Sequence, residues 1–112
     1  MLALAHLARA QLDLERLDEA LATVGESHAL LLNLGSVEDG EAHARLAFVE
    51  INLAAGNEMV ALRELAVARD RLLARAEKIA DAELRASFLT RVEEHARTLQ
   101  LALERGIKPV PR

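Results

Sequence analysis

Apolar residues recur along this chain at the three- and four-residue spacing of amphipathic helices, and short turns separate five such segments. The first segment shows the pattern well, with Leu4, Leu7, Ala8 and Leu12 following the helical period. We therefore expect an all-α fold with five helices. The pattern predicts helices over residues 2–14, 18–34, 38–55, 58–80 and 81–105.

Residues that begin or end helices support these boundaries. Asp18, Asn57 and Asp81 are predicted N-caps, because their side chains can accept hydrogen bonds from free backbone N–H groups. Gly56 is predicted to end the third helix. Gly25 lies inside the second helix, where we expect a neighbouring backbone to approach it closely; a tolerated surface glycine is the alternative.

Two stretches of the chain, residues 12–24 and 53–65, share an arrangement of apolar residues at an offset of 41 positions. Each stretch has the pattern of a helix end, a tight turn and the start of a second helix. A single helical hairpin cannot bury its apolar face, so a repeated hairpin indicates a stack.

These positions resemble the tetratricopeptide repeat, in which small and bulky apolar residues mark the points where paired helices cross. The matching residues are Ala8, Ala20, Val24 and Ser27 in the first repeat, and Val49, Ala61, Leu65 and Ala68 in the second. The match is degenerate, because Val49 stands where a small residue is usual. Positions that are aromatic in the family are mostly aliphatic here, with Phe48 as the exception. The offset of 41 residues is also longer than the family's repeat length of about 34.

The resemblance implies a single domain over residues 1–106, built as a short right-handed solenoid of two antiparallel hairpins and a capping helix. The stretch 72–103 also resembles the C-terminal end of long-repeat arrays in bacterial multi-domain ATPases, kinases and transcriptional regulators. The implied parts are repeat one (1–35), repeat two (38–80), a terminal helix (81–105) and a flexible tail (107–112).

In this family the first helix of each hairpin lines a concave groove. The resemblance therefore implies a groove of apolar residues with a few charges, which suits an extended or helical apolar segment more than an acidic tail. The alternative is that its leucines pack on neighbouring repeats or on a second copy of the chain. The residues that the resemblance places in the groove are Arg9, Leu12, Asp13, His43, Leu46, Glu50 and Leu53.

The amino-acid composition indicates which classes of partner and which cell compartment to expect. The net charge is −4 with acidic and basic residues interspersed, which gives no electrostatic footprint for nucleic acid. No apolar run approaches the roughly 20 residues that span a bilayer. The absence of cysteine fits a reducing cytoplasm. We expect a cytoplasmic protein that binds neither nucleic acid nor membranes.

The sequence offers no convincing catalytic, cofactor or metal site. Its four histidines lack metal-ligand spacing. His43 and Glu50, two helical turns apart, are too distant for direct contact. The adjacent carboxylates Glu93 and Glu94 are typical of a solvated helix face. We expect no enzymatic activity.

These observations favour a non-catalytic protein–protein interaction or scaffold module that binds a partner segment, or another copy of itself, through apolar helix faces. A pure oligomerisation domain and a regulatory ligand-sensing domain of a larger bacterial signalling protein are the alternatives. Leu2, Leu4, Leu7 and Leu12 carry more apolar surface than one partner helix covers. We therefore expect a homo-oligomer or a part of a longer repeat array.

Overall fold

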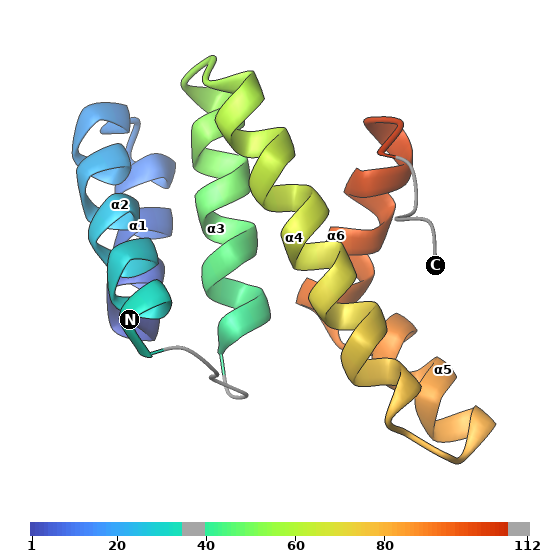
Figure 1. Ribbon diagram of the computed structural model, residues 1–112. Helices are drawn as coiled ribbons and strands as arrows, with labels where there is room; N and C mark the ends of the chain where they lie inside the picture. Colours follow the sequence, from blue (N-terminus) through green and yellow to red (C-terminus); the bar gives the residue numbers. More distant parts are fainter. Residues whose placement is uncertain (35–39, 108–112) are drawn as a thin grey trace.

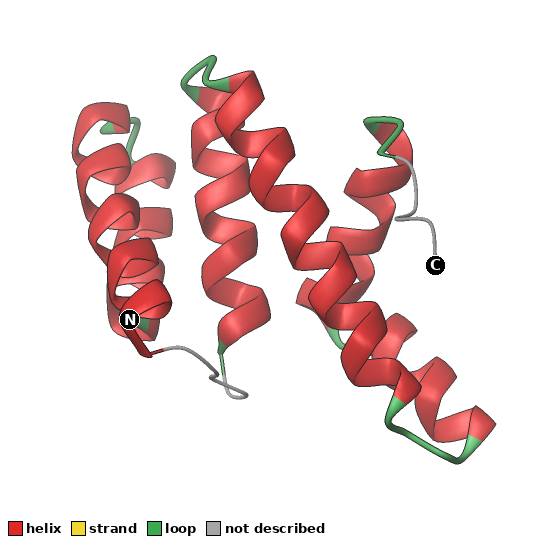
Figure 2. Cartoon of the chain, viewed as in Figure 1, coloured by secondary structure: helices red, strands yellow, loops and turns green. Residues whose placement is uncertain are grey.

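The computed structural model describes residues 1–34 and 40–107, which form helices joined by short turns (Figures 1 and 2). No strand occurs in these ranges, so the predicted all-α class is confirmed. The described part contains six helices rather than the expected five. They are α1 (Leu2–Asp13), α2 (Leu17–Leu34), α3 (Glu41–Ala54), α4 (Glu58–Glu77), α5 (Ala82–Thr90) and α6 (Glu93–Glu104).

The helices form a row in which each element packs on the next. α1 and α2 form a hairpin, and both contact α3, which forms the second hairpin with α4 (Figure 1). α6 contacts α3 and α4, while α5 packs on α4 and α6 at the end of the row away from α1. As a result, α1, α3 and α6 follow one another through the stack. The repeat family and the handedness of this arrangement stay predictions.

Two apolar clusters hold the stack together. The first lies where α3 meets the first hairpin, and the second lies where α4 and α6 close on α3. All eight crossing-point residues of the repeat pattern are buried, none of them more than 3% exposed. The buried members are Ala5, Ala8, Ala20, Val24, Ala44, Ala47 and Ile51 in the first cluster, and Leu46, Val49, Ala61, Leu65, Leu101 and Ala102 in the second.

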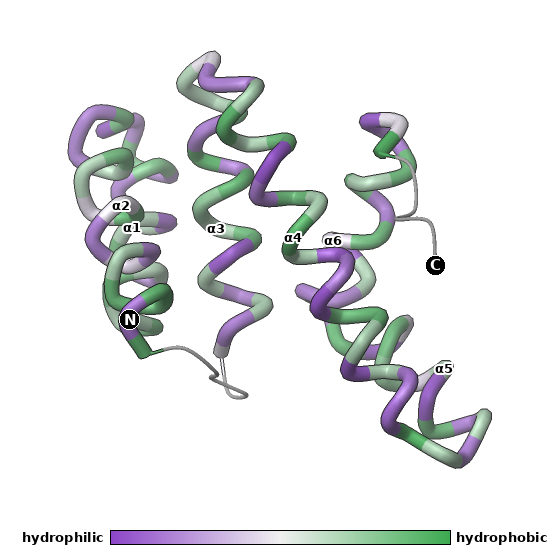
Figure 3. The backbone as a smooth tube through the Cα atoms, in the orientation of Figure 1, coloured by the Kyte–Doolittle hydropathy of each residue, from purple (hydrophilic) through white to green (hydrophobic). Residues whose placement is uncertain are grey.

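Apolar and polar segments alternate along the helices (Figure 3), as expected for helices with one buried side. None of the helices in the described ranges has the length and apolar content needed to cross a bilayer. Alanine dominates the first cluster, so the helices there can approach closely.

The two hairpin turns have the same backbone geometry although their sequences differ. In the second turn Gly56 has a φ of 83°, in the left-handed region that glycine enters without steric cost. In the first turn the equivalent residue is Glu15, with a φ of 62°. In both turns the next N–H donates to the carbonyl five residues back at 2.8 Å. This bond is typical of a Schellman helix ending, and it supports the predicted stop at Gly56.

The predicted continuous helix over 81–105 is wrong, because the chain breaks at Val92. Val92 has an extended backbone, with a ψ of 118°. The Nδ1–H of the buried His95 donates to the carbonyl of Phe88 at 2.8 Å, which satisfies an acceptor in the last turn of α5. The break divides the stretch into α5 and α6, and the apolar side chains of Leu84 on α5 and Leu103 on α6 are exposed.

Of the three predicted N-caps, one caps its helix through its side chain and two do not. The Asp81 carboxylate accepts the N–H groups two and three residues further on, at 2.8 and 3.0 Å, as predicted. Asp18 lies in the first turn of α2 rather than at its cap. Asn57 precedes α4, but its side chain donates to Asn52 instead of capping the helix.

The close approach of a neighbouring backbone that was expected at Gly25 is not found, and a side chain packs closely on Gly40 instead. Gly25 has no atom within 4 Å of the place a Cβ would take, so it is a tolerated surface glycine. Gly40 has a φ of 82°, and the Leu2 side chain lies 3.0 Å from the position that a Cβ would take there.

The bounds of two predicted helices differ from those observed. The helix predicted over 38–55 is observed as Glu41–Ala54, and the helix predicted over 58–80 is observed as Glu58–Glu77. The parts of these predictions that concern residues 35–39 and 108–112 lie outside the described residues.

Candidate functional site

Four of the seven residues predicted to line a groove come together where α1, α3 and α6 meet. α1 and α3 supply these four, and the first turns of α6 form a further wall. Together they surround a half-open pocket of about 320 Å³. The lining residues are Arg9, His43, Leu46, Glu50, Glu93, Glu94 and Arg97.

The other three predicted residues do not line this pocket. Leu12 packs against the first apolar cluster and Leu53 against the second. Asp13 is exposed on α1. The pocket is therefore narrower than the predicted groove and lies toward the N-terminal ends of α3 and α6.

Sequence reasoning missed the α6 wall. It treated residues 81–105 as one capping helix and assigned Glu93 and Glu94 to a solvated face. Neither residue carries a local signal for a site, because the break at Val92 is what directs the first turn of α6 toward α3.

An ion pair joins the two first helices of the hairpins beside the pocket. Arg9 Nη2 lies 3.0 Å from Glu50 Oε1, and the two side chains are 30% and 27% exposed. A pair this close to water contributes about 0.2–1 kcal/mol to stability. Its larger effect is to hold both side chains in place and to pair the two charges.

His43 places a neutral imidazole in the pocket. Burial lowers the pKa of His43 below its ordinary value of 6.5, and the positive Arg9 and the nearby His6 lower it further. Glu94 and Glu50 oppose this shift. The His6 and His43 rings lie 4.4 Å apart. The buried Nε2 of His43 has no hydrogen-bond partner among the described residues.

Two carboxylates of the pocket lack a basic partner. Arg9 is paired with Glu50, and Arg97 lies 3.9 Å from Glu104. Within the described ranges no ion pair reaches Glu93 or Glu94. Both lie in the first turn of α6, where the helix dipole favours negative charge. The pocket thus offers two carboxylates without an ion-pair partner among the described residues.

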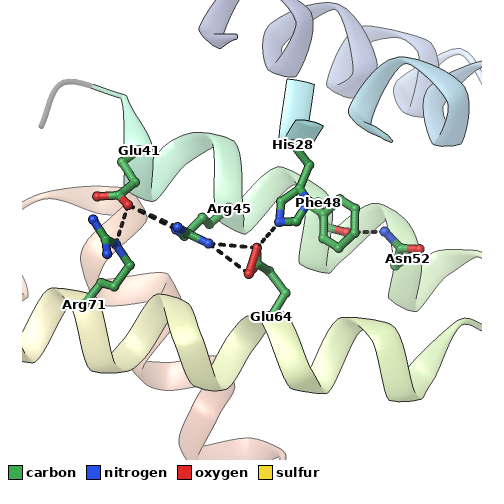
Figure 4. A network of polar contacts seen from close by, with 7 residues as sticks. All are labelled: His28, Glu41, Arg45, Phe48, Asn52, Glu64 and Arg71. Carbon is green, nitrogen blue, oxygen red and sulfur yellow. Dashed lines mark hydrogen bonds and ion pairs between the residues drawn. The ribbon is translucent and has the colours of Figure 1, made fainter. Parts of the chain in front are cut away.

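A second polar cluster lies buried between α2, α3 and α4 (Figure 4). Arg45 Nη1 donates to both carboxylate oxygens of Glu64 at 2.9 and 3.0 Å, and its Nη2 donates to Glu41 at 3.2 Å. His28 also contacts Glu64, and Arg71 also contacts Glu41. The three central side chains are each less than 9% exposed.

This network fixes three helices relative to one another. The His28 ring stacks on Phe48 at 4.1 Å, which aligns α2 with α3. The position equivalent to His28 in the second repeat is Arg69, which donates to the carbonyl of Ile107 at 2.8 Å. His28 thus bonds to the second hairpin, and Arg69 bonds to the residue three positions after the end of α6.

Sequence reasoning also missed this network. The signal is Glu64, which lies in the apolar stripe of α4 between Ala61 and Ala68. A charged residue at such a position is buried only when it is paired.

Comparison of the chain with protein-family models, with curated proteins and with solved structures gives no significant match. The resemblance to tetratricopeptide repeats therefore stays a prediction. Within the described part of the chain, no group of three or more His, Cys, Asp or Glu residues is placed to hold a metal ion.

Proposed function

We propose that this chain is a non-catalytic interaction module that holds a segment of a partner protein in the pocket between α1, α3 and α6. The observation that carries the proposal is the convergence of Arg9, His43 and Glu50, from two repeats, with Glu93 and Glu94 from α6. The first helices of stacked hairpins commonly present such extended binding surfaces.

The lining indicates the chemistry of the partner segment. Arg9 and Arg97 already have carboxylate neighbours, whereas Glu93 and Glu94 have no cation in contact. A lysine or arginine of the partner would supply that cation. Leu46, only 4% exposed, forms the apolar floor of the pocket, and the buried Nε2 of His43 would form a hydrogen bond only with a side chain that inserts beside it. The expected partner is therefore an apolar segment with at least one basic side chain.

The volume of the pocket sets the scale of the contact. About 320 Å³ is at the lower end of the range for small-molecule pockets. It accommodates one or two side chains rather than a whole helix. The rest of the partner segment would lie along α1 and α3.

Selection of short random peptides displayed on phage, with the whole chain immobilised, tests the proposal. We expect enriched peptides to combine a basic residue with neighbouring apolar residues. Their binding should shift the backbone amide NMR signals of His43, Glu50 and Glu94.

A matched pair of variants provides the control. Glu93→Gln with Glu94→Gln should weaken binding of the selected peptides by about tenfold, the effect of losing a charge-assisted contact of about 1.4 kcal/mol. Glu26→Gln, an exposed site on α2 away from the pocket, should leave binding unchanged. Failure to enrich any peptide, or amide shifts confined to other surfaces, would overturn the proposal.

A further inference from the structure

α1 carries an exposed apolar stripe on the side that faces away from α3. Its four members follow the helical spacing of four, three and four residues, so they lie in one line. Leu7 and Leu14 are 48% and 65% exposed. The stripe consists of Ala3, Leu7 and Ala10 on α1 and of Leu14, the residue directly after its last turn.

The second repeat shows how such a stripe is normally used. The residues 41 positions later are Ala44, Phe48, Ile51 and Ala55. Ala44 and Ile51 are buried in the first apolar cluster, and Phe48 packs against it. Ala44, Phe48 and Ile51 belong to the surface through which α3 packs on the first hairpin. The α1 stripe is therefore a stacking surface whose counterpart is missing from the described residues.

The stripe is complementary to itself. It alternates a small and a large side chain, and it carries no charge. An antiparallel copy of α1, related by a two-fold axis between Ala8 and Arg9, would place Leu7 opposite Ala10. The same axis would place Leu14 opposite Ala3. Large residues facing small ones allow two helices to interlock, and a two-fold contact uses the same patch on both subunits.

One polar residue beside the stripe, His6, is directed away from such a contact. His6 stands where the second repeat has Ala47. Its ring lies 4.4 Å from the ring of His43 and thus leans toward α3.

We infer that two copies of this chain associate through antiparallel packing of their α1 stripes. This surface is separate from the α1–α3–α6 pocket, so the inference goes beyond the proposed function. α1 has 12 residues and is about 18 Å long. A contact of that length is smaller than the interface of an obligate dimer, so we expect a reversible dimer that depends on concentration.

Sedimentation velocity of the whole chain over a wide concentration range is the first test. We expect a reversible monomer–dimer equilibrium. Leu7→Glu and Leu14→Glu should each raise the dimer Kd at least about tenfold, because each buries a charge against an apolar partner. Met59→Glu, at a 76% exposed site on α4, is the matched control and should not change Kd. A monomer at every concentration, or a dimer insensitive to both stripe variants, would overturn the inference.

A size exchange tests the register. Ala10→Leu alone should weaken the dimer, because it sets Leu against Leu7 of the other copy. Adding Leu7→Ala should restore it, because each large residue again faces a small one. Lack of restoration would contradict the proposed axis.

Disulfide trapping tests the register independently, because the chain has no cysteine of its own. A mixture of Leu7→Cys and Ala10→Cys chains should cross-link, whereas each variant alone should cross-link much less.

Peptide binding separates this inference from the proposed function. The Leu7→Glu variant, expected to be monomeric, should bind the selected peptides as the unmodified chain does, so a failure of the dimer can be distinguished from a failure of the pocket.

Discussion

α1 and α3 occupy equivalent positions in the two hairpins, but their surroundings differ. α1 has two buried residues, Ala5 and Ala8, whereas α3 has nine. The first hairpin covers one side of α3, and α4 and α6 cover the other. α1 is covered on one side only. Burial at a repeat position thus depends on its neighbours in the stack as well as on the helical pattern.

The two helices also differ in how they use polar residues. Arg45 of α3 stands where α1 has Leu4, and it links two buried carboxylates, Glu41 and Glu64. A buried charge of this kind is stable only where neighbouring elements supply partners. α4 supplies Glu64 and α3 itself supplies Glu41, whereas the half-covered α1 has no buried charge of this kind.

The largest effect is expected from breaking the network in α3. Arg45→Met should lower the free energy of unfolding by about 3–5 kcal/mol, because Glu41 and Glu64 lose their shared cation in a buried site. Leu4→Met, the equivalent position in α1, should cost less than about 1.5 kcal/mol. Urea unfolding followed by circular dichroism measures both. An equal loss of unfolding free energy in the two variants would show that the buried network does not stabilise α3 more than the equivalent apolar residue stabilises α1.

A second pair of variants compares apolar packing at equivalent positions. Ile51→Ala should cost about 3 kcal/mol, because Ile51 is fully buried in the first cluster. Ala10→Ile at the equivalent position of α1 should change the stability of the monomer by no more than about 0.5 kcal/mol, because Ala10 is exposed. Thermal unfolding at low protein concentration checks both values. A large effect of Ala10→Ile in the monomer would mean that the stripe is covered within one chain.

The sequence allowed the all-α class and the hairpin turns to be predicted, because helical periodicity is a local signal. The eight residues that the resemblance matched to crossing points are all buried, but their place in a tetratricopeptide repeat stays a prediction. The break at Val92 was missed because it depends on His95 reaching Phe88 from the next helix. Four pocket residues on α1 and α3 were predicted from the resemblance alone. The residues of α6 could not be added, because the position of that helix is decided by packing on α3 and α4.

The hairpin turns provide a smaller test. Gly56→Ala should cost about 1 kcal/mol, because alanine is strained at a φ of 83° although no atom lies within 4 Å. Glu15→Gly should stabilise the first turn by about 0.5 kcal/mol, since relief of the left-handed strain at 62° outweighs the added freedom of the unfolded chain. Opposite signs in urea unfolding are the expected outcome. A loss of stability in Glu15→Gly would mean that the Glu15 side chain stabilises the folded protein by more than its left-handed backbone conformation destabilises it.

The smallest effect concerns pH and a second polar difference near the start of the two helices, where α3 has His43 and α1 has Leu2. The pKa of His43 is lowered in the folded protein, mainly by burial. In the unfolded chain the imidazole takes up a proton near its ordinary pKa of 6.5. Just below that pH the unfolded state therefore binds more protons than the folded state.

The free energy of unfolding should consequently fall as the pH is lowered from 6.5 toward the folded-state pKa of His43. Above pH 6.5 both states carry a neutral ring, and this contribution is fully present. His43→Leu, which gives α3 the residue of α1, should remove this part of the pH dependence. Urea unfolding of both chains on either side of pH 6.5 measures the change in slope, and an NMR titration of the His43 ring should give a midpoint below 6.5. A midpoint at or above 6.5 would mean that the carboxylates of Glu50 and Glu94 outweigh burial, and the pocket would then hold a charged imidazole.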